Sequence, residues 1–315
     1  MNTATITEVA EVKNEMKQKL FSVSKKIGNT PLIPIRHLHE NKKVRIYAKA
    51  EWQQLSGSVK ARAAFNIIRH AIETGNLDEN RILLDATSGN TGIAYAAIAK
   101  EMGLSVVLCL PANASEERKS ILQSLGAQIV YTSKFGGTDE AQEVAAELAL
   151  ENPDKYFYAS QYTNEQNWKA HYYGTAVEIA RDAPPFTHFV AGLGTTGTFV
   201  GTGRRLKEFN PNVQLIALQP DFAMHGLEGW KHLDTATVPQ IYDASVADRI
   251  LEVSSNRAHD IIKEAARKED LLLSPSSAAN LAGALQIASE IEEGVIITVL
   301  PDNADKYSEI IKQIF

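Results

Sequence analysis

The most constraining feature of this sequence is a repeated alternation between short apolar runs and longer amphipathic segments. The apolar runs carry hydrophobic residues at nearly every position, as in Ser105–Leu110 and Gly294–Val299. A strand of this kind is buried on both faces, as in a parallel sheet that is covered by helices. The alternation therefore predicts an α/β protein with mostly parallel sheets between two layers of helices.

The predicted elements form two series, which an N-terminal helical arm at Ile6–Leu20 precedes. The first series pairs strands with the helices that follow them: Arg45–Ala50 with Val59–Glu73, Arg81–Ala86 with Thr91–Met102, Ser105–Leu110 with Ser115–Leu125, and Gln128–Tyr131 with Asp139–Leu150. The second series has strands at His188–Ala191, Val213–Leu218, Arg249–Val253 and Gly294–Val299, and helices at Lys169–Arg181, Thr196–Phe209, Ala258–Lys268, Ser276–Ile287 and Asp305–Ile314. We therefore expect two α/β units, with a long irregular loop over Asp221–Asp248 in the second.

Composition excludes several classes of function. The 315 residues carry a formal net charge of -6, which argues against a nucleic-acid-binding surface. No apolar run is long enough to cross a membrane, and the first twenty residues mix acidic and basic side chains, unlike a targeting peptide. The single cysteine, Cys109, lies in an apolar strand, where a small buried hydrophobe is the expected role. A reducing, cytoplasmic location is expected. No His, Cys or carboxylate pair has metal-ligand spacing.

The segment Glu51–Asn66 places a lysine where helix electrostatics disfavour a cation. Lys60 follows a strand and a polar turn, and it falls in the first turn of the next predicted helix. A helix N-terminus carries partial positive charge and free amide groups, so it repels cations and binds anions. An amine held there is a candidate Schiff-base lysine, because the local field favours its neutral form. A solvated lysine on an amphipathic helix is the alternative interpretation.

Two further turns follow predicted strands and contain glycine. Thr87–Gly92, with the sequence TSGNTG, offers uncharged donors and close backbone approach, which suit a carboxylate or a phenolic oxygen. Gly192–Thr198, with the sequence GLGTTGT, offers free amides and three hydroxyls at a helix start, which suit a phosphate. For the first turn, a simple capped helix is the alternative.

The GLGTTGT turn also matches the dinucleotide-binding pattern G-x-G-x-x-G. Its glycines are Gly192, Gly194 and Gly197, and Asp221 is the candidate for the acid expected about 20 residues later. A dinucleotide-binding oxidoreductase is therefore an alternative of another class. That interpretation assigns no function to Lys60 or to the TSGNTG turn.

A fourth turn, Ser274–Asn280, opens a helix after an apolar run. Ser274 alone would cap this helix, so Ser276 and Ser277 exceed what a cap needs. A neutral hydroxyl there suits a ring nitrogen, and solvent exposure is an equally good interpretation.

Together the four turns resemble the fold-type-II pyridoxal-phosphate family, and within it the cysteine synthases, or O-acetylserine sulfhydrylases, with their cystathionine β-synthase-like relatives. The similarity runs from IGNTPL at Ile27 to LPDNADKY near the C-terminus. It implies a tryptophan synthase β-like fold of two three-layer α/β domains. Residues 1–50 and 163–315 would form the large cofactor-binding domain, and residues 51–162 a smaller, mobile substrate-binding domain.

The resemblance also implies the cofactor, pyridoxal 5'-phosphate, and the residues that bind it. Lys60 matches the lysine that holds the cofactor and acts as the catalytic base, Asn90 the contact to its phenolic oxygen, and Ser276 the serine at its ring nitrogen. The remaining cofactor residues form the phosphate loop: Gly194, Thr195, Thr196, Gly197 and Thr198. The substrate-binding residues are Ser88, Gly89, Thr91, Gln161 and Gly226.

The activity that the resemblance implies is a β-replacement. An activated serine such as O-acetylserine would lose its β-substituent to give an aminoacrylate, and a sulfur nucleophile would add to form cysteine or a related thioether amino acid. A serine at the ring nitrogen should leave that nitrogen unprotonated and the ring a weaker electron sink. A cystathionine or lanthionine synthase and a cysteine desulfhydrase are alternatives within the family. A catalytically inactive homologue that serves as a binding partner or sensor is a further alternative. A homodimer is implied, with the N-terminal arm as a candidate interface and a sulfur-carrier protein as a candidate partner.

Several positions depart from the family pattern. Gln54-Leu55 replaces the usual Asn-Pro, Ala61 an Asp after the lysine, Gln219 the Glu of Glu-Pro, and Ser274-Pro275 the Gly-Ile that precedes the ring-nitrogen serine. Asp221 stands where the branch that uses O-phosphoserine has an Arg, and an acid there repels a phosphate dianion. Lys231 and His232 lie downstream and are candidates to replace that Arg. The donor and the sulfur source therefore stay open.

Overall fold

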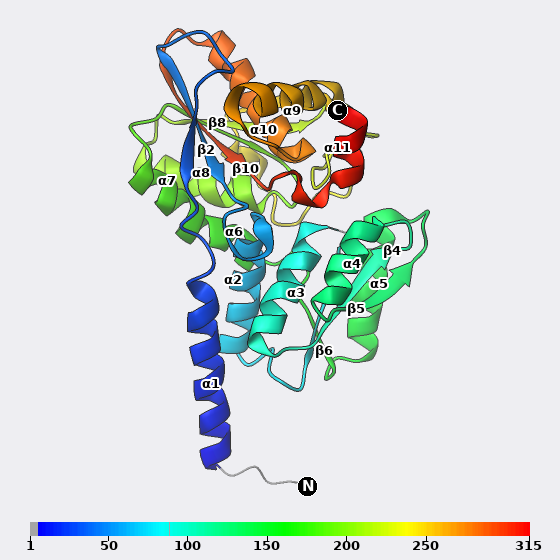
Figure 1. Ribbon diagram of the computed structural model, residues 1–315. Helices are drawn as coiled ribbons and strands as arrows, with labels where there is room; N and C mark the ends of the chain where they lie inside the picture. The colour runs from blue at the N-terminus through cyan, green and yellow to red at the C-terminus, as the bar shows by residue number, and fades with distance from the viewer. Residues whose placement is uncertain (1–5, 88) are drawn as a thin grey trace. The chain divides into compact units, whose positions relative to one another are not determined.

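The structure is a computed structural model that describes residues 6–87 and 89–315. Its contacts divide the chain into two compact units (Figure 1). Unit 1 holds the described residues up to Gly28 together with Ile67–Ala159, and unit 2 holds Asn29–Asn66 together with Ser160–Phe315. Helix α2, Lys60–Glu73, begins in unit 2 and ends in unit 1.

Unit 2 is built on a six-stranded sheet with the order β1-β2-β10-β7-β8-β9. Only the edge strand β1 is antiparallel to its neighbour. Its strands are β1 (Leu32–Ile35), β2 (Val44–Ala50), β10 (Gly294–Leu300), β7 (His188–Gly192), β8 (Gln214–Pro220) and β9 (Arg249–Val253). Because the central strands are parallel, their carboxyl ends meet at one edge of the sheet, where ligands bind in such folds.

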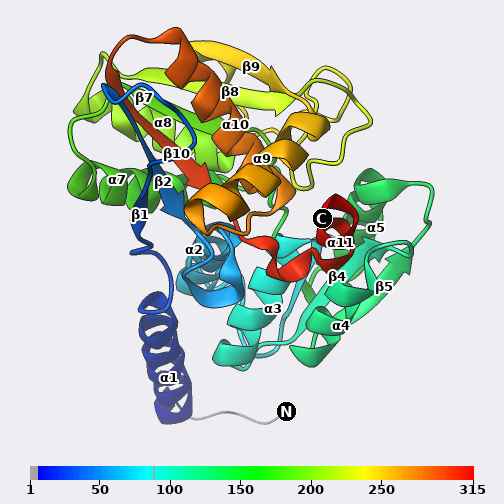
Figure 2. The same cartoon turned by 45° about the horizontal axis from the view of Figure 1, so that its top comes forward.

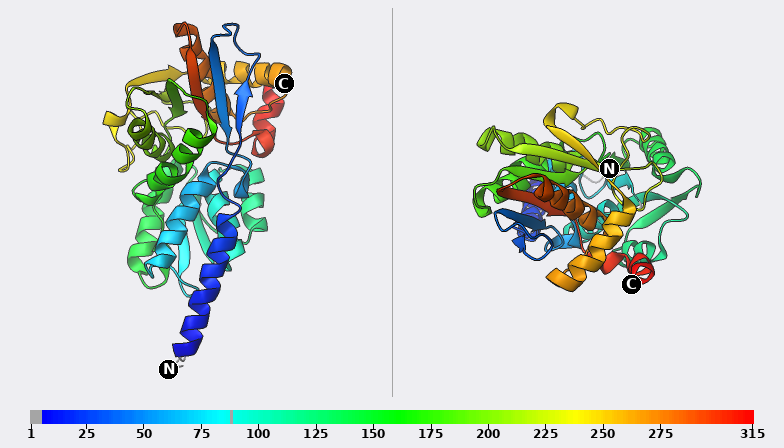
Figure 3. Two further views of the ribbon diagram at one scale, coloured as in Figure 1. Left: turned by 90° about the vertical axis from the view of Figure 1, so that its left-hand side faces the viewer. Right: turned by 90° about the horizontal axis from the view of Figure 1, so that it is seen from above.

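Helices cover both faces of this sheet, as Figure 3 shows. On one face, α9 (Ser255–Glu269) and α10 (Pro275–Glu290) share a hydrophobic core with alternate strand residues such as Ile296. On the other face, α7 (Ala176–Asp182) and α8 (Gly197–Phe209) pack against the intervening residues, such as Val295 and Ile297. Successive strand residues point to opposite faces of the sheet. Because helices cover both faces, the residues on each face must be apolar. This burial explains the continuous apolar runs in the sequence.

The remaining elements of unit 2 are short. They are the 3-10 turns Leu55–Gly57, Ala244–Val246 and Ala304–Lys306, the helices α6 (Gln166–Ala170) and α11 (Ser308–Ile314), and a π-helical segment at His171–Thr175.

Unit 1 contains a four-stranded parallel sheet with the order β5-β4-β3-β6. Its strands are β3 (Ile82–Ala86), β4 (Val106–Pro111), β5 (Gln128–Thr132) and β6 (Tyr156–Tyr158), and its helices are α1 (Ile6–Ser24), α3 (Asn90–Met102), α4 (Glu116–Ser124) and α5 (Gly137–Glu151) (Figure 2). Helix α5 shares a core with Val107 and Cys109, whereas Leu108 packs towards α3 and α4. Helix α1 packs against α3.

The fold class predicted from the sequence is confirmed: two α/β units with mostly parallel sheets. Strand β6 was not predicted, because three residues, Tyr156–Tyr158, are too few to show a pattern. The predicted division into a large and a smaller domain stays a prediction, and the compact units are delimited differently. Residues 51–66, predicted in the smaller domain, lie in unit 2, since Glu51 and Val59 donate backbone hydrogen bonds to the carbonyls of Leu300 and Pro301. Residues 6–28, predicted in the large domain, lie in unit 1, where α1 packs against α3. Among the described residues, no helix is sufficiently long and apolar to span a bilayer.

Candidate active site

Lys60 is the first residue of α2, and the turn before it is fixed by partly buried hydrogen bonds. Gly57 has a φ of +64°, and its carbonyl accepts a 2.8 Å hydrogen bond from the Lys306 amine. The side-chain amide of Gln54 donates to Glu51 Oε2 over 2.8 Å. The turn is therefore tied both to the end of β2 and to the C-terminal segment, so the helix that carries Lys60 starts at a fixed point.

A buried tetrad of charged side chains holds this helix start. Its members, which we call the charge tetrad, are Lys49, Glu51, Arg62 and Glu178. The Arg62 guanidinium contacts Glu51 Oε2 at 2.6 Å and Glu178 Oε1 at 2.7 Å, and Lys49 contacts Glu178 Oε2 at 2.7 Å. Two positive and two negative charges compensate one another. Although burial opposes the charge on Arg62, the two carboxylates raise its pKa, so it stays protonated.

The Lys60 amine is electrostatically prepared for proton transfer. Burial lowers the pKa of its ammonium to about 8, and the carboxylate of Asp302 partly opposes this effect. An amine with such a pKa is neutral in roughly one molecule in ten at pH 7, a far larger share than for an ordinary lysine. Lys60 is therefore suited to act as a nucleophile and as a base.

The GLGTTGT turn joins β7 to α8, and most of it is buried. Thr196 is the N-cap residue with a left-handed φ of 70°, and the first amides of α8, like those of any α-helix, have no intrahelical partner. Its hydroxyl is buried and has no hydrogen-bond partner among the described residues. An orphaned donor beside the free N-terminus of a thirteen-residue helix fits an anionic group such as a phosphate.

Two side chains that the sequence analysis left unassigned support this turn. His171 lies in the π-helical segment, with Nδ1 2.9 Å from Thr175 Oγ1 and Nε2 3.3 Å from Thr198 Oγ1. Burial, reinforced by the charges of Arg62 and Lys60, holds its pKa well below the usual range, so the imidazole is neutral. Asn167 donates over 2.8 Å to the carbonyl of Gln161. A π-helical insertion is common at functional sites, but no sequence rule predicts one here.

The glycines of this turn are required by neighbouring parts of the same chain. A Cβ at Gly192 would lie 2.1 Å from the Trp230 ring, and one at Gly194 would lie 1.9 Å from the Gly229 carbonyl. A Cβ at Gly197 would lie 2.1 Å from Asn167 Oδ1. Asp221, the proposed ribose acid, is exposed on a surface groove that includes none of these glycines. The glycine spacing therefore has a packing explanation and gives no support to dinucleotide binding.

Ser276 is buried in the first turn of α10 and joins a hydrogen-bonded cluster. Ser274 caps the helix by accepting from the Ser277 amide at 3.2 Å, and its hydroxyl donates to Asp302 Oδ1. Tyr307 donates to Asp302 Oδ2 at 2.6 Å. The Ser277 hydroxyl donates to the Asp302 carbonyl at 2.5 Å, so it fixes this aspartate to α10. The sequence pattern did not single out Asp302.

The other two predicted residues of unit 2 differ in exposure. Gln161 is buried, and its carbonyl is held by Asn167. Gly226 is exposed, and its amide donates to the Ser255 hydroxyl over 2.9 Å. Lys231, the candidate to replace the missing Arg, has its amine 5.1 Å from the centre of the Tyr162 ring.

The TSGNTG turn joins β3 to α3 in unit 1. A Cβ added to Gly89, the N-cap, would meet nothing within 4 Å, so this backbone is open to approach. Thr91 is buried and Asn90 is partly buried at the helix start. Gly92 packs closely, because a Cβ there would lie 3.0 Å from Thr87. Ser88, also predicted to bind substrate, lies outside the described residues.

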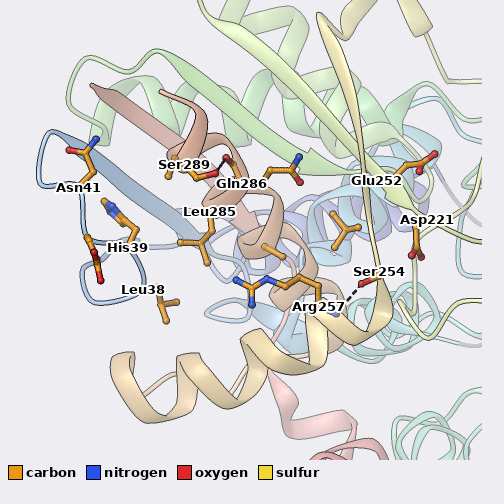
Figure 4. Close-up of a pocket in the computed structure, with 14 residues that line it drawn as sticks. Leu38, His39, Asn41, Asp221, Glu252, Ser254, Arg257, Leu285, Gln286 and Ser289 are labelled. Carbon is orange, nitrogen blue, oxygen red and sulfur yellow. Dashed lines mark hydrogen bonds between the residues drawn. The ribbon is translucent and has the colours of Figure 1, made fainter. Parts of the chain in front are cut away.

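Neither a surface groove nor the thiol of Cys109 adds a residue to the candidate site. A groove of about 790 Å³ runs along α9 and α10 and contains none of the predicted binding residues (Figure 4). The thiol of Cys109 is buried and burial raises its pKa to about 11, which agrees with its predicted role as a core residue. Within residues 6–87 and 89–315, no cluster of three potential metal ligands occurs.

Comparison with protein families gives one match that covers most of the chain. The family model described as "Pyridoxal-phosphate dependent enzyme" matches residues 23–302. The matched range includes Lys60, the GLGTTGT turn and Ser276.

Individual relatives agree with the family match. A cysteine synthase of Aquifex aeolicus is 43% identical over 294 residues, which cover 91% of this chain and 90% of the relative. An O-acetylserine dependent cystathionine beta-synthase of Bacillus subtilis is 36% identical and covers 94% of this chain and 98% of the relative. The crystal structure of a cysteine synthase from Entamoeba histolytica superposes with a TM-score of 0.86 at 30% identity, covering 93% of this chain and 90% of that one.

Proposed function

This chain belongs to the pyridoxal-phosphate-dependent enzymes, and from that membership we propose that it catalyses β-replacement on an activated serine, with a sulfur nucleophile as the second substrate. The observation that carries the proposal is the pairing, within unit 2, of a lysine of lowered pKa with a helix N-terminus that has an orphaned hydroxyl. These residues fit the two anchoring groups of pyridoxal 5'-phosphate, its aldehyde and its phosphate.

When bound, pyridoxal phosphate withdraws electrons from the α-carbon of an amino acid that is joined to it. Residues Gly194–Thr198 would hold its phosphate through the free amides of α8 and the Thr196 hydroxyl. Lys60 would hold its aldehyde and then move the proton at the substrate Cα. Ser276 would face its ring nitrogen. In unit 1, Asn90 would contact its phenolic oxygen.

The substrate carboxylate is assigned to uncharged donors. The TSGNTG turn, through Ser88, Gly89 and Thr91, would bind it in unit 1, and Gln161 and Gly226 would contribute from unit 2. Neutral donors orient a carboxylate without forming a salt bridge that would hold the product. The open Gly89 backbone supports this assignment.

For the donor we propose O-acetylserine. The relatives include a cysteine synthase and an enzyme named as O-acetylserine dependent. Asp221 is exposed and stands where the branch that uses O-phosphoserine has an Arg. Its negative charge disfavours a phosphorylated donor. Sulfide is the acceptor that the cysteine synthase similarity favours. A thiol amino acid is the second candidate, because the Bacillus subtilis relative is named a cystathionine β-synthase.

We further propose a homodimer in the cytoplasm, with a sulfur-carrier protein as a candidate sulfur donor. Support for the dimer and the carrier comes only from the family resemblance.

The test of the proposed function is the reaction itself. The purified protein, loaded with pyridoxal phosphate, is incubated with O-acetylserine and either sulfide or homocysteine, and the products are identified by mass spectrometry. We expect cysteine from sulfide, and Lys60→Ala should abolish both the visible absorption band and the product. A wild-type protein that binds no pyridoxal phosphate contradicts the proposal.

A further inference from the structure

A buried histidine, His171, lies between two threonines, and the proposed function gives it no role. It is 1% exposed and belongs to the π-helical segment that packs against α8. Its Nδ1 lies 2.9 Å from Thr175 Oγ1 in the same segment, and its Nε2 lies 3.3 Å from Thr198 Oγ1 in the first turn of α8. The imidazole therefore connects a buried hydroxyl to the proposed phosphate loop.

The surroundings of the imidazole keep it neutral. Burial lowers the pKa of His171 most, the cations Arg62 and Lys60 lower it further, and the carboxylate of Glu178 opposes them. A neutral imidazole has one N–H donor and one acceptor nitrogen. It therefore donates to one of the two threonines and accepts from the other.

The burial of Thr175 decides which nitrogen carries the hydrogen. Thr175 is fully buried, and among the described residues its hydroxyl makes one hydrogen bond, to His171 Nδ1. If Nδ1 carried the hydrogen, the Thr175 oxygen would accept it, and the hydrogen of the Thr175 hydroxyl would be buried without an acceptor, at a substantial cost. Thr175 therefore donates to Nδ1, and the imidazole donates from Nε2 to Thr198 Oγ1.

We propose that Thr175 and His171 form a hydrogen-bond relay that makes the Thr198 oxygen an acceptor, so that the Thr198 hydroxyl gives its hydrogen to the phosphate of bound pyridoxal phosphate. The relay builds on the proposed function, which places the phosphate at Gly194–Thr198. Thr198 is only partly buried, so its hydroxyl is open to a ligand. A hydroxyl that accepts one hydrogen bond donates the next one more strongly, because linked hydrogen bonds polarise one another. Thr175 and His171 are positioning residues, since they act through Thr198.

Close packing between the π-helical segment and α8 holds the relay in place. A Cβ added to Gly201 of α8 would lie 2.0 Å from the Trp168 carbonyl and 3.0 Å from His171 Cβ. A Cβ added to Gly197 would lie 2.1 Å from Asn167 Oδ1. The two helical segments therefore touch through their backbones on both sides of Thr198, so the imidazole and the Thr198 hydroxyl keep their spacing.

The first test determines the tautomer of His171. The full-length protein is labelled with nitrogen-15 in its histidines, loaded with pyridoxal phosphate and studied by NMR, which separates the protonated nitrogen of a neutral imidazole from the unprotonated one. The resonances of His171 are those that disappear in His171→Asn. We expect a neutral ring near neutral pH, with its hydrogen on Nε2. A hydrogen on Nδ1, or a charged ring, overturns the proposal.

The second test compares two variants that each retain one part of the imidazole. In His171→Gln the side-chain amide can replace Nε2 and donate to Thr198, whereas the shorter amide of His171→Asn can replace only Nδ1. Titration of cofactor-free protein, followed by fluorescence, should show that the affinity for pyridoxal phosphate falls about fivefold in His171→Asn, as expected for one hydrogen bond between uncharged groups. His171→Gln should stay near the wild type. Affinity for pyridoxal, which has no phosphate, should be unchanged in both variants.

His188→Asn is the matched control. His188 also has its Nδ1 beside a threonine, 2.8 Å from Thr187 Oγ1, but it lies at the opposite end of β7 from the GLGTTGT turn. This variant should bind both compounds as the wild type does.

Two results in the variants would overturn the relay and leave the proposed function standing. One is an equal affinity of His171→Asn and His171→Gln for pyridoxal phosphate, and the other is an equal loss of affinity for pyridoxal and for pyridoxal phosphate in His171→Asn. A wild-type protein that does not bind pyridoxal phosphate overturns the proposed function and the relay together.

Discussion

At the scale of single residues, the account depends on side chains whose neighbours change their chemistry. Lys60 is the clearest example, because burial brings the pKa of its ammonium to about 8 while Asp302 opposes that change. The sequence placed this lysine at a helix start. It could not place Asp302, which lies more than two hundred residues later.

The first prediction concerns the reactivity of Lys60 in cofactor-free protein. Since only the neutral amine is nucleophilic, its labelling by an acylating reagent should rise with a midpoint near pH 8, as peptide mass spectrometry would show. Asp302→Asn removes the attraction that favours the ammonium, so the midpoint should move to lower pH. Asp305→Asn is the control, because Asp305 is exposed and is bonded to Asn303. A midpoint near 10.5 in the wild type would refute the proposed burial effect.

The second prediction concerns the orphaned hydroxyl of Thr196. Thr196→Val keeps the branched shape but removes the hydroxyl, so pyridoxal-phosphate affinity should fall about tenfold, by loss of one hydrogen bond to a charged group. Stability should barely change, because no protein partner is lost. Thr202→Val is the matched control, since Thr202 is also buried, unpartnered among the described residues and on α8. Equal affinities for the two variants, measured by fluorescence titration, would be inconsistent with a phosphate at Thr196.

At the scale of elements, the charge tetrad fixes the start of α2 against β2 and α7. Arg62 lies in the same first turns of the helix as Lys60, and its guanidinium spans Glu51 and Glu178. A displaced Arg62 would also displace Lys60.

The third prediction follows from the burial of this tetrad. Arg62→Met would leave two carboxylates with one lysine, so the free energy of unfolding should fall by about 3–5 kcal/mol. Arg69→Met, on the same helix, should change it by less than about 0.5 kcal/mol, because Arg69 is exposed and lies 3.9 Å from Glu73. Denaturant titration measures both values. If Arg62→Met and Arg69→Met lower the free energy of unfolding equally, the charge tetrad does not hold the helix.

The sequence predicted the parts of the fold that depend on local pattern. Strands such as β4 and β10 are apolar at nearly every position because both faces are covered, so they could be located from the sequence. The turns at Lys60 and at Gly194 were found because strand ends, glycines and hydroxyls lie next to one another in the chain.

What the sequence could not show depends on contacts between distant segments. The hydrogen bond between Ser274 and Asp302 and the pairing of Arg62 with Glu178 have no local signature. The π-helical segment that carries His171 is a rearrangement within an otherwise ordinary helical pattern. The edge strand β6 is too short for its period to be recognised.

At the scale of the whole molecule, two α/β units share the helix α2, and each supplies proposed ligands. Unit 2 holds the lysine, the phosphate loop and Ser276, and unit 1 holds the TSGNTG turn. We propose that unit 2 anchors the cofactor and contributes Gln161 and Gly226 to the substrate site, and that unit 1 binds the substrate carboxylate and contributes Asn90 to the cofactor.

The fourth prediction concerns assembly. We expect a homodimer in solution, and the proposed role of the N-terminal arm as an interface predicts that deletion of residues 2–19 yields a monomer. Light scattering coupled to size-exclusion chromatography measures the mass of both proteins. A truncated protein that remains dimeric would remove the arm from the interface, and a full-length monomer would contradict the dimer itself.

The central claim is that Lys60 holds pyridoxal phosphate in unit 2. Borohydride reduction of the loaded protein, followed by proteolysis and peptide mass mapping, tests it most directly. The account predicts a pyridoxyl group on the peptide that contains Lys60 and on no other. A label on a different lysine, or none in a protein that has bound the cofactor, would contradict it.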